Sequence, residues 1–339
     1  MRSELFSRAL VRFGLLLGTG LCFSVAQADT TLLNVSYDVS RELYKDINPA
    51  FSAHWQAGHG GEKVTVNQSH GGSSKQAMSV AAGLEADVVT MNQSPDIDIL
   101  VTQGGLVAAD WKKRFPHEAA PYTTLSVFLV RKGNPKGIRD WSDLTRPDIQ
   151  VIVPNPKTSG NGRYTYLAAW GYALEQAKGD EAKAKAFVKA LFRNVPVLDG
   201  GGRGATTTFT QRDIGDVLVT FENEAVLIGK EVGGAQFEVV YPSLSIEAAA
   251  PVAVVERVVD KRGSRALATA YLNFLFSPAG QEIIAKHSFR PRDPAILKKY
   301  AARFPALRVF TVENRLGGWA KVQQTHFADG GIYDQIVEQ

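Results

Sequence analysis

The residues best suited to chemistry in this sequence stand in four short turns, each between an apolar run and a helical pattern. The turns are rich in Gly, Ser, Asn and Asp, and they occupy residues 34–38 (NVSYD), 68–74 (QSHGGSS), 157–162 (KTSGNG) and 199–204 (DGGGRG). The first N–H groups of a helix have no partner inside it, and the helix dipole adds positive charge at that end. Helix starts therefore bind anions through uncharged donors. Four such starts meeting in one cleft would hold a dehydrated dianion.

Helix capping is the alternative interpretation of each turn taken alone, because Ser, Asp and Gly are common at helix ends. Two features favour binding for the set: the turns carry many donors, and the run Gly200–Gly202 costs chain entropy unless a close approach requires it. The Asp38 carboxylate is expected to cap or brace, because an Asp just before a helix commonly caps it. For Arg203, in the fourth turn, two roles stay open: tuning the site, or a structural ion pair.

Other kinds of site are not supported by the sequence. A phosphate-binding P-loop needs G-x-x-x-x-G-K-[ST], and neither glycine-rich turn fits it. His54, His59 and His70 lack an H-E-x-x-H motif, so no metal site is expected. No G-x-S-x-G elbow is present, and the single pair Glu222 and Glu224 does not define an acid–base site. We therefore expect no enzyme, no cofactor and no metal.

The elements that position the turns alternate along the chain. Short β-branched runs predict strands, and apolar side chains at i, i+3, i+4 and i+7 predict helices. The expected strands are 31–37, 63–68, 86–91, 126–132, 150–154, 217–221 and 237–241. Helical spacing occurs at 77–84, 167–177 and 184–191, and the four turns predict helices from about Ser40, Lys75, Arg163 and Ala205. This alternation predicts an α/β fold.

Composition limits the class of protein. The chain has 339 residues, of which 45% are hydrophobic and 21% charged, with a formal net charge of +4. These values exclude a disordered protein, a disulfide-stapled miniprotein and a polytopic membrane protein. The small and scattered positive excess does not predict a nucleic-acid partner.

The first 28 residues have the pattern of a secretory signal peptide. Arg2, Arg8 and Arg12 precede an apolar stretch over 13–25, and small residues at 26 and 28 predict cleavage after Ala28. The stretch is short of the ~20 residues that a membrane-spanning helix needs, which disfavours an anchor. The single cysteine lies in this segment, so the mature protein is expected to be exported and free of thiols.

At the four turns the sequence resembles the periplasmic sulfate/thiosulfate-binding proteins of ATP-driven anion uptake systems. The segments that carry the resemblance are 33–43, 68–77, 128–135 (FLVRKGNP), 154–166, 201–209 and 215–223 (GDVLVTFEN). The resemblance implies a two-lobed periplasmic-binding-protein fold of type II, with residues 29–123 and about 255–339 in lobe 1 and about 124–254 in lobe 2. It also implies a monomer whose partners are the anion and the permease subunits of an ABC transporter in the inner membrane.

The resemblance implies a set of anion contacts at the same turns. The positions that match the family's contacts are Asp38, Ser73, Ser159, Gly160, Asn161, Gly202 and Phe221. A supporting set around them is expected to comprise Ser74, Asn92 and Arg203.

Two of these positions depart from the sulfate-binding branch and resemble the thiosulfate-binding branch. Phe221 stands where that branch has Trp, and Asn161 stands where it has Gly. Phe lacks the indole N–H donor. Thiosulfate replaces one oxygen by a sulfur that accepts hydrogen bonds poorly, so it loses little there, whereas sulfate would keep an under-bonded oxygen at a cost of roughly 1–3 kcal/mol. We therefore expect thiosulfate binding, with sulfate as a further ligand. The alternatives are a sulfate-preferring or other oxyanion receptor and, more remotely, a periplasmic phospho- or sulfoester hydrolase.

Overall fold

Two β-sheets, each with its own helices, form the molecule. The computed structural model describes residues 30–231 and 236–338. The predicted signal peptide and its cleavage site lie outside the described residues. The first sheet has the strand order β10-β3-β1-β2 and consists of β1 (Thr30–Tyr37), β2 (Val64–Gly71), β3 (Val88–Thr90) and β10 (Val252–Val254). β1 runs parallel to β2 and β3, and β10 is antiparallel to β3.

The second sheet is larger and mixed. Its main path has the order β12-β9-β4-β7-β5-β6, and β8 and β11 also pair with β4. Its strands are β4 (Tyr122–Arg131), β5 (Val151–Pro154), β6 (Leu198–Asp199), β7 (Val217–Phe221), β8 (Phe237–Val240), β9 (Ser245–Ala249), β11 (Arg290–Pro291) and β12 (Val309–Phe310). β5 is parallel to β6 and β7, which makes this half of the sheet an α/β unit like the first.

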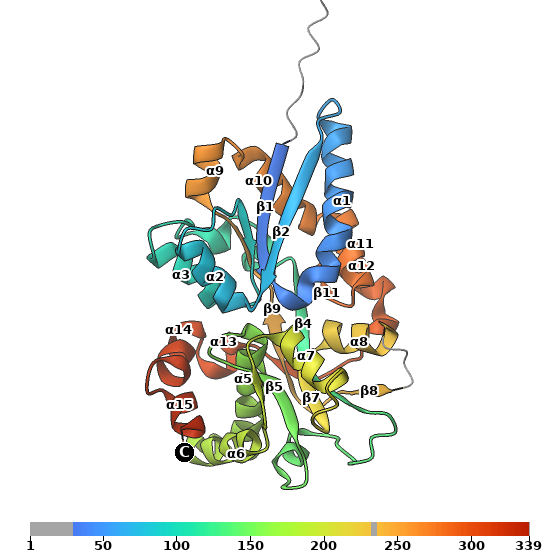
Figure 1. The fold of residues 1–339 in the computed structure, drawn as a ribbon, viewed down its shortest axis with the longest axis vertical. Coiled ribbons are helices and arrows are strands. Elements are labelled where there is room, and N and C mark those ends of the chain that lie inside the picture. Colours follow the sequence, from blue (N-terminus) through green and yellow to red (C-terminus); the bar gives the residue numbers. More distant parts are fainter. Residues whose placement is uncertain (1–29, 232–235, 339) are drawn as a thin grey trace, which may run out of the picture.

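Helices cover both sheets, and the sheets occupy opposite halves of the molecule (Figure 1). Around the first sheet lie α1 (Arg41–Gly58), α2 (Ser73–Ala81), α3 (Ser94–Thr102), α9 (Glu256–Arg262), α10 (Arg265–Phe276) and α11 (Pro278–Lys286). Around the second lie α5 (Gly160–Gln176), α6 (Glu181–Arg193), α7 (Gly202–Thr210), α8 (Glu222–Glu231), α13 (Val312–Leu316), α14 (Trp319–Val322) and α15 (Ile332–Val337). The short helical segments α4 (Pro116–Ala119) and α12 (Pro294–Lys299) join other elements. The expected two-lobed α/β architecture is confirmed.

Apolar periodicity explains the longer helices. In α1 the side chains of Leu43, Ile47, Phe51 and Trp55 recur every fourth residue and are buried against the first lobe. In α6 the expected stripe is buried at three of its four positions, and the Asp180 carboxylate caps the helix by accepting from the N–H of Lys183 at 3.1 Å.

Three of the four helices at the turns begin earlier than the sequence predicts. α2 begins at Ser73 rather than Lys75, α5 at Gly160 rather than Arg163, and α7 at Gly202 rather than Ala205. Glycine and serine have low helix propensity, which favours a later start in a sequence reading. The first turn of a helix tolerates them, because its N–H groups have no helical partner in any case. The glycines and serines of the turns therefore belong to the helix starts themselves.

The end of the chain packs on the second lobe rather than the first. The expectation assigned all of 255–339 to lobe 1, but β12 pairs with β9 in parallel, and α15 packs against α6. Buried Phe310 and Tyr333 anchor this segment, and Tyr333 stacks edge-on against Tyr166 of α5 at 5.7 Å. The reason is burial of apolar surface: α5 is buried along most of its length, so its outer side must be covered, and the end of the chain covers it.

Across the described residues, no helix is both long and apolar enough to span a bilayer.

Candidate anion-binding site

The carboxyl ends of the parallel strands define one edge of each sheet. In the first sheet Tyr37 pairs with Gly71, so β1 and β2 end side by side. In the second sheet Pro154 pairs with Asp199, so β5 and β6 also end together. Each of the four turns leaves one of these strand ends. Because ligands of α/β sheets bind outside the carboxyl ends of the strands, both edges are candidates for one site.

The first and fourth turns meet through the Asp38 carboxylate. Its Oδ1 accepts the N–H of Val39 at 3.0 Å, and its Oδ2 accepts the N–H of Arg203 from the other lobe at 3.0 Å. Burial raises the pKa of Asp38, while the Arg203 and Val39 N–H groups act in the opposite direction. The carboxylate therefore braces the lobes, and the capping or bracing role expected for it is confirmed. Its acceptor oxygens are occupied by N–H groups of the chain.

The second turn touches the third and fourth turns through Gly72. A Cβ atom at Gly72 would lie 2.7 Å from the carbonyl oxygen of Thr158 and 2.9 Å from that of Gly200. Real Cβ atoms do not approach backbone oxygens so closely, so this contact between lobes requires glycine. The next residue, Ser73, begins α2, and its Oγ accepts the N–H of Asn92 at 3.2 Å. Gly72 was not among the residues predicted from the sequence to contact the anion.

The third turn supplies the start of α5. Ser159 is the N-cap, and its side chain accepts the N–H of Gly162 at 3.4 Å. A Cβ at Gly160 would lie 1.9 Å from Asn92 Oδ1, so Asn92 of lobe 1 lies directly on Gly160 of lobe 2. Asn161 follows, and its Nδ2 donates to the hydroxyl of Thr220 at 3.1 Å.

The fourth turn closes the ring of contacts. A Cβ at Gly202 would lie 2.9 Å from Val39 Cγ1 and 3.0 Å from Asn161 Nδ2, and a Cβ at Gly201 would lie 2.5 Å from Asp38 Oδ2. Gly202 is the first residue of α7, so its N–H is one of those without a helical partner. The structure thus brings all four turns to one place between the lobes.

Two further predicted residues lie beside this ring. Phe221 ends β7, is fully buried, and meets Tyr164 edge-on at 5.9 Å between ring centres. Ser74 is buried in the first turn of α2, where its hydroxyl accepts from Gln93 Nε2 at 3.0 Å. Thr220, which precedes Phe221 in β7 and accepts from Asn161 Nδ2, was not predicted from the sequence. Its position next to Phe221 on a strand ending at the cleft was the available signal.

Arg203 forms an ion-pair bridge between the lobes. Its Nη2 lies 2.7 Å from Glu42 Oε2 in α1 and 3.4 Å from Glu224 Oε2 in α8. Glu42 was also missed, although it stands one helical turn after Asp38. Burial raises the pKa of Glu224 to about 7, against the opposing effects of Arg203 and of the Thr206 hydroxyl, which donates to it at 2.8 Å. The neighbouring Glu222 pairs instead with Arg290, so the two glutamates have separate structural partners.

The raised pKa of Glu224 makes stability depend on pH. The folded protein holds the proton up to about pH 7, whereas an unfolded glutamate releases it near 4.5. The stabilisation of the folded state that comes from this proton is therefore fully present below pH 4.5, and it is lost as the pH rises through 7. Urea unfolding at pH 4.5 and pH 8 should show that Glu224→Gln stabilises the protein at pH 8 only, by on the order of 2 kcal/mol. An equal effect at both pH values would contradict this prediction.

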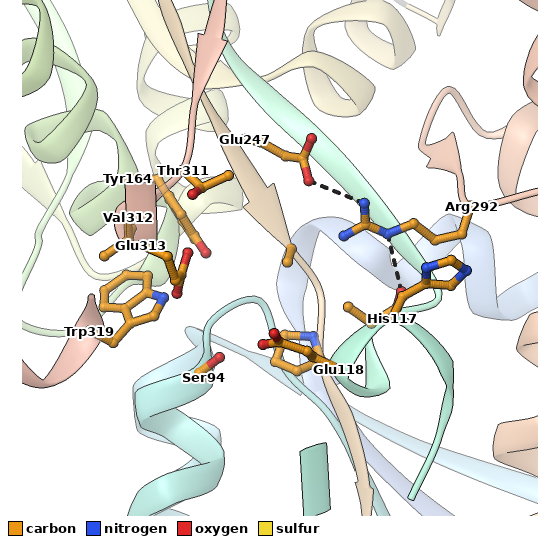
Figure 2. Close-up of a pocket in the computed structure, with 13 residues that line it drawn as sticks. Ser94, His117, Glu118, Tyr164, Glu247, Arg292, Thr311, Val312, Glu313 and Trp319 are labelled. Carbon is orange, nitrogen blue, oxygen red and sulfur yellow. Dashed lines mark hydrogen bonds and ion pairs between the residues drawn. The ribbon is translucent and has the colours of Figure 1, made fainter. Parts of the chain in front are cut away.

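A cavity between the lobes lies apart from the four turns and is rich in carboxylates. Its volume is about 350 Å³, and none of the predicted site residues lines it. Figure 2 shows the carboxylates of Glu118, Glu247 and Glu313 around it, with Arg292 held by Glu247 at 3.2 Å. Carboxylates outnumber cations here, so this cavity is unsuited to a dianion.

Among the described residues, no group of three or more acidic, histidine or cysteine side chains is arranged to hold a metal ion.

Comparison with known proteins shows the family of the chain. The family model described as "Bacterial extracellular solute-binding protein" matches residues 33–290. The chain belongs to this family. A "Thiosulfate-binding protein" of Pseudomonas aeruginosa is 60% identical to this chain over 98% of both chains. A "Sulfate-binding protein" of Escherichia coli is 54% identical over 95% of this chain and 99% of its own length.

Solved structures of solute-binding proteins give the same result. The sulfate-binding protein SubI from Mycobacterium tuberculosis superposes with a TM-score of 0.79 at 35% identity, covering 87% of this chain and 98% of that one. A periplasmic thiamin binding protein superposes with a TM-score of 0.60 at 17% identity, covering 84% and 86%, which supports the fold alone. The resemblance found at the four turns is confirmed, and it extends over the chain.

Proposed function

We propose that this protein is a periplasmic receptor that binds thiosulfate, and also sulfate, between its lobes and delivers it to an ABC permease for sulfur assimilation. The printed names of the relatives, thiosulfate-binding and sulfate-binding, support this class of ligand. The proposal includes a monomeric receptor without catalytic activity, exported through a signal peptide cleaved after Ala28.

The observation that carries the proposal is the ring of helix starts. Gly72 of one lobe and Gly160 and Gly202 of the other all make contacts that leave no room for a Cβ. Gly72 caps α2, and Gly160 and Gly202 begin α5 and α7, whose first N–H groups are the proposed donors. N–H groups and hydroxyls of helix starts stabilise an anion without a cationic side chain. The proposed contacts are Asp38, Ser73, Ser159, Gly160, Asn161, Gly202 and Phe221, supported by Ser74, Asn92 and Arg203.

The mechanism follows from where the donors lie. Lobe 1 supplies the starts that follow β1 and β2, and lobe 2 supplies those that follow β5 and β6. With the lobes apart, each half-set faces water. When an anion joins them, the lobes close, the Asp38 carboxylate accepts the Arg203 N–H, and water is excluded. Closure strengthens each hydrogen bond to the anion, because the exclusion of water lowers the local dielectric constant. No bond is made or broken, and opening on the permease releases the anion.

Calorimetric titration with thiosulfate, sulfate, molybdate and phosphate tests the proposal. Thiosulfate is expected to bind, sulfate to bind no more tightly, and phosphate to bind poorly because its proton would meet no acceptor among the donors. Native mass spectrometry of the protein as purified should show a monomer, with any bound anion identified by its mass. Sulfate binding at least tenfold tighter than thiosulfate would favour the sulfate-preferring alternative, and turnover of a sulfoester or phosphoester would favour the hydrolase.

Phe221→Trp should shift the preference toward sulfate. An indole N–H adds the donor that phenylalanine lacks, and a recovered hydrogen bond to a charged oxygen is worth about 1.5 kcal/mol, or roughly tenfold in the ratio of affinities. Titration of both anions measures this ratio, and thermal unfolding checks that the larger ring fits the buried position. An unchanged ratio in a stable variant would show that position 221 does not discriminate.

A further inference from the structure

The Arg203 guanidinium lies between two carboxylates that belong to different lobes. Glu42 is in the first turn of α1 in lobe 1, and Glu224 is in the first turn of α8 in lobe 2. Arg203 is in α7, on the same lobe as Glu224. Its pair with Glu224 is therefore possible whether the lobes are open or closed, whereas its pair with Glu42 needs closed lobes. The family resemblance assigns no role to Glu42.

In this structure the guanidinium makes its better contact with the other lobe. Arg203 Nη2 donates a hydrogen bond to Glu42 Oε2 at 2.7 Å. Glu224 Oε2 lies 3.4 Å from the same nitrogen but outside hydrogen-bonding geometry, and this buried oxygen has no hydrogen-bond partner among the described residues. Arg203 Nε is buried and unpaired as well. Closed lobes thus satisfy Glu42 and leave the carboxylate of Glu224 only partly compensated.

Glu224 is the more deeply buried of the two carboxylates. Its side chain is fully buried, whereas that of Glu42 is 19% exposed. Its Oε1 accepts from the Thr206 hydroxyl at 2.8 Å, and a neutral hydroxyl does not compensate a buried charge. When the lobes separate and Glu42 moves away, we expect Arg203 to form a full ion pair with Glu224. The observed separation of 3.4 Å means that a small turn of the guanidinium is enough to form this pair.

We propose that Arg203 exchanges its partner during capture, from Glu224 in the open protein to Glu42 in the closed protein, and that Glu42 is thereby a positioning residue for the anion. The inference rests on the proposed function and deepens it. Arg203 directly follows Gly202, and its own N–H is held by the Asp38 carboxylate of lobe 1. A guanidinium held by Glu42 therefore fixes the start of α7 against lobe 1, with the proposed donor of Gly202 in place.

The two pairs act in opposite directions. The pair with Glu42 stabilises the closed form, and the competing demand of Glu224 for the same cation stabilises the open form. An exchange between two partners keeps closure reversible, which a receptor that must release its anion requires.

The first test compares two variants that remove the same charge from the same guanidinium. In calorimetric titration at pH 8, Glu42→Gln should bind thiosulfate about fivefold more weakly than the unaltered protein, and Glu224→Gln about twofold more tightly. At this pH the Glu224 carboxylate is ionised, because burial raises its pKa only to about 7. A general electrostatic effect would instead tighten the binding of a dianion in both variants. Unweakened binding by Glu42→Gln, or weaker binding by Glu224→Gln, would overturn the inference.

A double variant shows whether Glu42 acts through Arg203. Arg203→Met should weaken thiosulfate binding, and adding Glu42→Gln to it should cost less than about a further twofold, because the carboxylate has already lost the group that it holds. Losses that multiply in the double variant would overturn the positioning role, since Glu42 would then act by another route.

Kinetics separate an effect on closure from an effect on folding. Since the anion enters the open form, Glu42→Gln should raise the dissociation rate of thiosulfate about fivefold in stopped-flow measurements and leave the association rate within about twofold. Its thermal unfolding without ligand should match that of the unaltered protein, because the open form lacks the pair. A lower unfolding temperature with unchanged rates would show a merely structural role and overturn the inference. If the unaltered protein binds neither thiosulfate nor sulfate, the proposed function fails, whereas unweakened binding by Glu42→Gln contradicts this inference alone.

Discussion

Replacing Gly72 by alanine is expected to weaken thiosulfate binding about a hundredfold or more while leaving the lobes folded. The methyl group would lie 2.7 Å from the carbonyl oxygen of Thr158 and 2.9 Å from that of Gly200. Both oxygens are backbone atoms of the other lobe, so neither can turn aside as a flexible side chain would. The clash exists only when the lobes are closed. The variant should therefore unfold at the same temperature as the unaltered protein without ligand, and lose the thermal shift that thiosulfate produces.

Gly200→Ala provides the matched control for this prediction. Gly200 lies in the facing turn, but a Cβ there would meet nothing within 4 Å, and its φ is not in the left-handed region. Its affinity should stay within about threefold of the unaltered protein. Tight thiosulfate binding by Gly72→Ala would mean that the contact between the lobes in this structure is not required for capture.

Arg290→Met is expected to lower the free energy of unfolding by about 3–5 kcal/mol, more than any other substitution proposed for this protein. The Arg290 guanidinium holds the Glu222 carboxylate in a two-pronged ion pair at 2.7 and 2.9 Å, and Glu222 is fully buried. Methionine keeps much of the side-chain volume but leaves a buried negative charge without its partner. The pair joins β11 to the start of α8, directly after Phe221, so it also fixes the end of β7 at the site. Urea unfolding measures the loss.

Two comparisons make the Arg290 prediction specific. The double variant Glu222→Gln with Arg290→Met removes both charges and should recover a large part of the loss. Lys261→Met breaks an exposed pair with Glu85, whose side chains are 67% and 56% exposed, and should cost less than about 1 kcal/mol. If the double variant were as unstable as Arg290→Met alone, loss of packing rather than the unpaired charge would be responsible.

The strands of the fold were largely predictable, and the short ones were not. The expected strands at 31–37 and 217–221 agree with β1 and β7, because both are buried β-branched runs with clear turn signals after them. No strand was predicted at β9, at β10, or at β6, β11 and β12, the last three of which have two residues each. A two-residue strand has no periodicity of its own. It exists because a longer neighbour offers it a hydrogen-bonding edge.

The turns of the candidate site were predictable because their chemistry is local. Gly, Ser and Asp after an apolar run indicate a helix start whichever fold surrounds it, and this local signal located the four turns. The family resemblance then pointed to Asp38, Ser73, Ser159 and Gly202 within them. The brace between Asp38 and the Arg203 N–H, by contrast, joins positions 165 residues apart. Pairings of this kind, like that of Asn161 with Thr220, depend on how the lobes meet and leave no mark in local spacing.

The sequence by itself determined the α/β class, the four donor-rich strand ends, the absence of a recognisable catalytic motif, and the family to which these turns point. Only the tertiary structure decided that the turns meet, that Gly72 and Gly160 are points of contact between lobes, and that the last helices cover the second lobe. The physical reason is the distance along the chain between the residues that determine each feature. Strand periodicity and helix-start donors are set by a few neighbouring residues, whereas a contact between lobes depends on the packing of every element that connects them.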